Sequence, residues 1–108
     1  MQQKKVDAAL AHRDVVVSAV RRSVREAIVR LEAARDRARV IESSVTPHVE
    51  YAFDVARVGY ASNRGEFADL LDTERVLLST RMDVVAARAG VERATADLAM
   101  AIGDIPEN

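Results

Sequence analysis

The fold is decided by a six-residue stretch, Ala61-Ser62-Asn63-Arg64-Gly65-Glu66. Asn and Gly tolerate the left-handed backbone angles that are common where helices end. Between Pro47 and the C-terminal end of the sequence there is no other strong turn signal. Acidic residues follow the stretch and suit the positive end of a second helix. The sequence therefore predicts a turn over residues 62–65, with a helix on each side of it.

Before the turn, apolar residues recur with the 4-3 spacing of a coiled coil and predict one helix over residues 4–61. One set of heptad positions contains Leu10, Val17, Val24, Leu31, Ala38, Val45 and Ala52. The interleaved set contains Val6, Arg13, Val20, Ala27, Ala34, Ile41, His48 and Val55. Pro47 either starts a new helix capped by Thr46 or kinks a continuing helix. Because the heptad phase runs through Val45, His48 and Val55, we expect a kink near residue 47.

After the turn, a second helix is predicted over residues 66–103, ended by Gly103 and Pro106. Its heptad positions are Leu70, Leu77, Val84, Val91 and Leu98. Beside them run one stripe of Leu71, Leu78 and Val85 and another of Ala87, Ala94 and Ala101. A solitary hairpin needs a single apolar face. The surplus predicts further helices packed against this one.

Together these patterns predict an all-α fold for residues 1–108, a single long antiparallel coiled-coil hairpin with unequal helices. The first helix would be about 87 Å long and the second about 57 Å. About 20 N-terminal residues would then carry an apolar stripe with no partner in the chain. An exposed stripe of that length indicates association. We expect the isolated chain to form a homodimer or a larger bundle.

Composition excludes several classes of function. The chain is 31% charged with a formal net charge of −1, and its arginines are interleaved with acidic residues, so nucleic-acid binding is not expected. Cysteine is absent, and no apolar run is long enough to cross a bilayer. His12 and His48 would lie about 54 Å apart on one helix and cannot share a metal ion.

Catalysis is not expected either. Asp69 and Asp72 share a helix face, but a paired acid and base need a pocket that separates their pKa values. A two-helix hairpin provides none, and no nucleophile lies beside a base. We therefore expect neither an enzyme nor a cofactor.

The segment from Tyr60 to Asp72 resembles the tip motif in the second repeat of the TolC family of outer-membrane efflux proteins. The matching positions are Tyr60, Phe67, Leu70, Leu71, Asp72, Arg75 and Leu77, followed by Leu98, Ala101, Ile102 and Gly103. Val45-Thr46-Pro47 resembles the heavy-metal branch of that family, of the CusC and CzcC type. Two positions depart from the pattern: Asn63 replaces the family's glycine, and Gly65 replaces a basic residue of the entrance, beside Arg64.

The resemblance implies a trimer whose barrel lies in the outer membrane and whose helical tunnel crosses the periplasm. This chain would be the C-terminal periplasmic hairpin, in contact with the membrane only through a barrel outside it. Tyr60, Asp69 and Asp72 would line the tunnel entrance, where rings of carboxylates favour cations. Docking to a periplasmic adaptor, and through it to an inner-membrane pump, would involve Ser62, Asn63, Arg64, Gly65, Glu66 and Phe67. Metal cations or drugs would be the cargo; the alternative is a free-standing coiled-coil scaffold.

Overall fold

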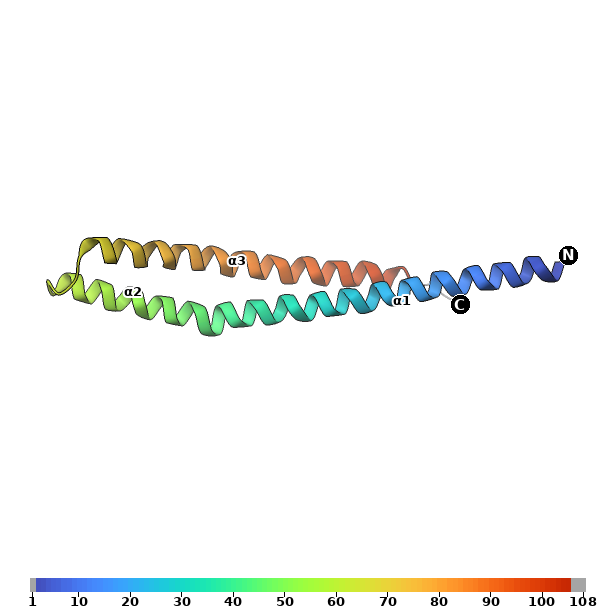
Figure 1. The fold of residues 1–108 in the computed structure, drawn as a ribbon, viewed down its shortest axis with the longest axis horizontal. Coiled ribbons are helices and arrows are strands. Elements are labelled where there is room, and N and C mark those ends of the chain that lie inside the picture. Colours follow the sequence, from blue (N-terminus) through green and yellow to red (C-terminus); the bar gives the residue numbers. More distant parts are fainter. Residues whose placement is uncertain (1, 106–108) are drawn as a thin grey trace. The chain divides into compact units, whose positions relative to one another are not determined.

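The structure is a computed structural model that describes residues 2–105. Helix α1 (Gln2–Val40) continues through a π-helical segment (Ile41–Val45) into α2 (Thr46–Ala61), and α3 (Phe67–Gly103) follows the turn (Figure 1). No β-strand occurs within the described range. The expected all-α helical hairpin with unequal arms is confirmed. Pro106 lies outside the described residues.

The chain divides into two compact units, each built from two helical segments that run antiparallel. The terminal unit contains α1 up to Ala33 and the chain from Arg93 onward, whereas the turn unit spans Ala34–Glu92. In the terminal unit, the buried residues are Ala27, Leu31, Ala94 and Ala101. In the turn unit, they are Leu77, Thr80 and Ala87. Most of these side chains are small, so the helices can pack closely along each seam.

The first part of the heptad pattern is confirmed. Along α1, the half-buried and buried residues are Val17, Val20, Val24, Ala27, Leu31, Ala34 and Ala38. They alternate between the two predicted sets of positions, and Ile41 continues the series. The residues between them are exposed. Up to residue 41, the apolar repeat therefore identifies the paired face correctly.

Beyond Ile41 the prediction is wrong by one residue, although Ala52, which it also placed on the seam, is half-buried. Val45, His48 and Val55 are exposed, with 54% of Val55 accessible, although the heptad placed all three on the seam. Their places are taken by Thr46, Val49, Phe53 and Ala56, which are half-buried. The π-helical segment causes this shift, because its wider i→i+5 turn holds one more residue than an α-turn.

Pro47 explains where the extra residue sits. Proline has no N–H, and in an α-helix its ring clashes with the carbonyl one turn earlier. Just before it, the backbone N–H of Thr46 donates to the Ile41 carbonyl in the π pattern, and the Thr46 hydroxyl donates to the same oxygen at 2.8 Å. Val45 and Thr46 keep right-handed helical angles, so no new helix is capped there. The single helix expected over residues 4–61 begins at Gln2 and is interrupted by this π turn, not by a capped break.

The paired face of α3 contains two of the three predicted stripes. It combines the set Leu70, Leu77, Val84, Val91 and Leu98 with the small-residue set Ala87, Ala94 and Ala101. Thr73 and Thr80 extend the small set toward the turn by the same steps of seven. Their hydroxyls donate to the carbonyls of Leu70 and Val76 in their own helix, at 2.9 and 2.8 Å. Both polar groups are therefore satisfied inside the seam.

Candidate functional site at the turn

The turn is closed by a Schellman motif centred on Asn63. The N–H of Asn63 donates to the Tyr60 carbonyl at 3.1 Å, and the N–H of Arg64 donates to the Gly59 carbonyl at 2.8 Å. Asn63 has a φ of 58°, and among the described residues it alone combines a positive φ with a side chain. Asn accepts this left-handed conformation at lower cost than most residues. The expectation that Asn63 tolerates a left-handed backbone angle where the helix ends is confirmed.

At Gly65 the backbone angle is ordinary, and the chain passes close to the backbone at the end of α2. No glycine in the described range has a positive φ. A Cβ built on Gly65 would lie 3.5 Å from both the Gly59 carbonyl carbon and the Tyr60 nitrogen, which is ordinary van der Waals contact. The chain therefore folds back over the last turn of α2 at this point. Helix α3 then begins at Phe67, one residue after the predicted start.

One aromatic pair joins the two sides of the turn. The ring centroids of Tyr60 and Phe67 lie 5.7 Å apart with a tilt of 58° between the planes. This distance is within the range of favourable aromatic contacts. Both rings are also about half exposed. The pair stabilises the turn and leaves part of each ring available to a neighbour.

The two predicted entrance aspartates are exposed and lie near the start of α3. Asp69 belongs to the first turn of the helix, where its charge complements the helix dipole. Asp72 lies 3.8 Å from a guanidinium nitrogen of Arg75, and both side chains are more than two-thirds exposed. Such a surface pair contributes little stability. The Asp72 carboxylate is therefore accessible to a cation or to a neighbouring chain.

All six predicted docking residues are exposed. Ser62, Asn63, Arg64, Gly65, Glu66 and Phe67 form the surface of the turn. The structure thus brings the nine predicted site residues into one continuous segment, residues 60–72, at the end of the turn unit. Their functional roles remain predictions.

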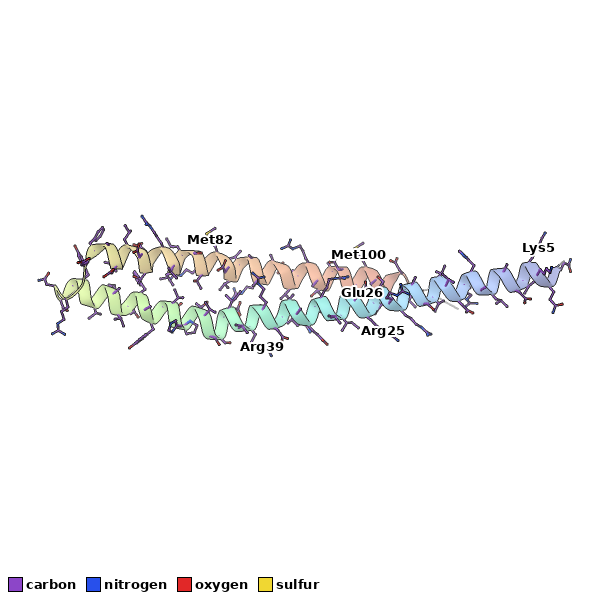
Figure 2. The ribbon with its side chains drawn as sticks, viewed as in Figure 1. Lys5, Arg25, Glu26, Arg39, Met82 and Met100 are labelled. Atoms are coloured by element: carbon purple, nitrogen blue, oxygen red, sulfur yellow. The ribbon has the colours of Figure 1, made fainter. Side chains whose placement is uncertain are left out.

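Apolar side chains also cover faces of the turn unit that lie outside the seam. On α2, Tyr51, Val55 and Val58 are exposed on the side opposite the paired face. On α3, Phe67, Leu78, Met82 and Val85 form a second exposed apolar face, and Val76 is exposed as well. Figure 2 shows Met82 projecting away from the facing helix, and 72% of this side chain is accessible. We call these the α2 outer face and the α3 outer face.

Elsewhere the described residues form open grooves. One groove, of about 530 Å³, lies in the terminal unit and is lined by Arg13, Asp14, Val17, Val20, Arg21, Val24, Arg25 and Ile105. The expectation that a two-helix hairpin provides no pocket was therefore too strict. In the part of the chain that is described, no three His, Cys, Asp or Glu side chains gather as metal ligands. Across residues 2–105, no helix has a stretch apolar and long enough to cross a membrane.

Some notable residues were missed by sequence reasoning. Glu42 and Arg88 form an ion pair between the two arms of the turn unit. Their spacing in the sequence carries no signal that would reveal it. The seam roles of Thr73 and Thr80, by contrast, could have been found by continuing the alanine stripe backward in steps of seven.

Comparison of the chain with protein-family models, curated proteins and solved structures gave no match.

Proposed function

We propose that this chain is a wall segment of the periplasmic tunnel of an outer-membrane efflux channel, and that its turn docks on a periplasmic adaptor of a tripartite pump. The observation that carries the proposal is the pair of outer faces on the turn unit. On these faces, apolar side chains of α2 and α3 stay exposed although the two helices already pack against each other along the seam. No catalysis and no cofactor form part of this function.

The outer faces support a wall because a wall helix touches neighbours on both sides. A hairpin that functions alone needs one apolar face, the one it buries. Here α2 presents Tyr51, Val55 and Val58 opposite its seam, and α3 presents Leu78, Met82 and Val85 on the side away from its own. Exposed apolar surface arranged in continuous stripes is typical of a contact region. Further helices packed against both faces would bury it.

The turn supports a docking and entrance role. Its residues Ser62 to Phe67 are exposed and are held in one conformation by the Schellman motif. Tyr60, Asp69 and Asp72 lie directly beside them, so threefold repetition would create acidic rings at the mouth of a tunnel. Rings of carboxylates concentrate cations and favour their passage. The cargo of such a channel would be metal cations or drugs, delivered by an inner-membrane pump.

A second candidate is a free-standing coiled-coil scaffold. The observation in its favour is the exposed apolar stripe near the start of α1, which does not involve the turn. A scaffold would use its length and its outer faces. It would have no need for a particular sequence at Arg64 or for carboxylates at Asp69 and Asp72.

Site-specific photo-crosslinking in the native cell tests the proposal. A benzophenone amino acid at Arg64 should crosslink the full gene product to a periplasmic adaptor, because this residue is exposed at the centre of the turn. The same probe at Asp97, an exposed position on α3 in the terminal unit, is the matched control and should not capture the adaptor. Location of the protein in the cytoplasm, or identical crosslinks from both positions, would favour the scaffold and refute the channel.

A further inference from the structure

The start of α1 carries an apolar stripe that no other described part of the chain covers. Residues 2–16 are all exposed, including 56% of Val6 and 54% of Leu10. Together with Arg13 and Val17, these two residues continue the seam of the terminal unit by the same heptad steps. We call Val6, Leu10, Arg13 and Val17 the free stripe; the first three are exposed and Val17, at its end, is half-buried. It is a coiled-coil seam with one helix missing.

The end of α3 limits how far another helix can extend along this seam. Ile105 follows α3 and lines the groove that also includes Arg13, Val17 and Val20. Val17 is the first half-buried residue of α1, so the chain itself begins to cover the seam there. A covering helix has room from the start of α1 to about Val17, which is the length of the free stripe.

We propose that the free stripe binds the free stripe of a second copy of this chain, with the two helices antiparallel. The two-fold axis would pass between residues 11 and 12. Val6 of each copy then faces Val17 of the other, and Leu10 faces Arg13. This contact is isologous, so it closes with two copies. It does not rest on the proposed channel function.

Charge is the reason for the antiparallel direction. In a parallel pair, each heptad position faces itself, and the two Arg13 guanidinium groups would meet in the seam, where like charges repel. In the antiparallel pair, Arg13 lies beside Leu10 of the other copy. On the flank of the stripe, Asp7 of one copy then lies opposite Asp14 of the other, and Arg13 lies within about one helical turn of both along the axis, so its positive charge offsets their repulsion.

The remaining surroundings also favour a second copy over a foreign helix. Asp7, Arg13 and Asp14 form no ion pair among the described residues of the chain itself. Each copy thus supplies the positive charge of Arg13 and the carboxylates of Asp7 and Asp14 that complement it in the other copy. On the other edge of the stripe, Ala9 would lie about 3 Å along the axis from Val16 of the second copy and extend the apolar contact. The interface is short, so we expect a dimer that dissociates on dilution.

Distances between spin labels test the direction directly. The chain has no cysteine, so single cysteines at His12 and at Arg30 can each be labelled without background. In the antiparallel dimer, labels at residue 12 lie close to the two-fold axis, whereas labels at residue 30 are separated by about 55 Å along the axis. A parallel dimer would give similar short distances at both positions. That result, or a monomer at all concentrations by light scattering, would overturn the proposal.

Two sets of variants test the residues. Leu10→Ala should weaken dimerisation about a hundredfold, because the symmetric contact loses the side chain twice. Val15→Ala is the matched control, since Val15 is an exposed residue of the same helix that lies off the stripe. Arg13→Glu should also weaken the dimer, and combining it with Asp7→Arg and Asp14→Arg should restore it. Equal effects of Leu10→Ala and Val15→Ala, or no rescue by the charge exchange, would contradict the proposed register.

Discussion

Deletion of Ser44 tests whether the π-helical segment is an inserted residue that Pro47 makes necessary. Ser44 is exposed within the segment. Its removal should convert the π turn into a regular α-helix and leave Thr46, Val49 and Ala56 on the seam. The ring of Pro47 then lies in the interior of an α-helix, which lowers the free energy of unfolding by about 3 kcal/mol. Pro47→Ala alone should change the stability by no more than about 1 kcal/mol, because the extra residue still requires the wider turn.

The two changes should therefore be strongly coupled. In the Pro47→Ala background, deletion of Ser44 should change the free energy of unfolding by no more than about 1 kcal/mol relative to Pro47→Ala alone. Deletion of Ser79, an exposed residue of α3, is the matched control. It rotates Leu70 and Leu77 away from the seam formed by the rest of α3, which costs about 4 kcal/mol of apolar burial. Pro47→Ala should not reduce that cost.

Chemical denaturation followed by far-UV circular dichroism gives the four stabilities of the cycle. All variants must be compared at one protein concentration, because association adds to apparent stability. The reasoning would be refuted if deletion of Ser44 cost the same with Pro47 and with alanine at this position. It would fail as well if, in the alanine background, deletion of Ser44 were as destabilising as deletion of Ser79.

Three other changes address the turn and the seam. Asn63→Ala should destabilise the hairpin by about 1–2 kcal/mol, because alanine is strained at a positive φ, whereas Asn63→Gly should not, as thermal denaturation will show. Asp69→Ala combined with Asp72→Ala in the full-length protein should raise ion permeability or change ion selectivity, and unchanged single-channel conductance would argue against the acidic entrance. Ala87→Leu should destabilise by about 1–3 kcal/mol through overpacking of a buried site, while the same change at exposed Ala86 should have little effect in denaturant titrations.

Local signals in the sequence were sufficient for the hairpin and its turn. The left-handed conformation of Asn63 follows from short-range chemistry, because few residues adopt it and the neighbouring helices need a stop. The seam from Val17 to Ala38 follows from the regular spacing of apolar residues. Both features depend on a single helix and its immediate flanks, so the sequence contains the information directly.

The seam of α2 could not be predicted in the same way. Two apolar series run through this helix: one contains Val45, Ala52 and Val55, and the other contains Val49, Phe53 and Ala56. The heptad count selects the first, whereas the structure half-buries all of the second and only Ala52 of the first. The choice depends on how the backbone accommodates Pro47, since an α-helical kink preserves the phase and a π turn shifts it. Periodicity alone cannot distinguish these two outcomes.

The distribution of side-chain size between seam and surface indicates how this chain gains stability. The buried seam residues are mainly alanines, such as Ala27, Ala87 and Ala94, which allow close packing but remove little apolar area from water. Larger apolar side chains, including Tyr51 and Met82, remain largely exposed on the outer faces. The outer faces therefore carry large apolar side chains that are still exposed to water and that a neighbouring helix could bury. It follows that contacts with further helices should stabilise the chain more than any change within its own seam.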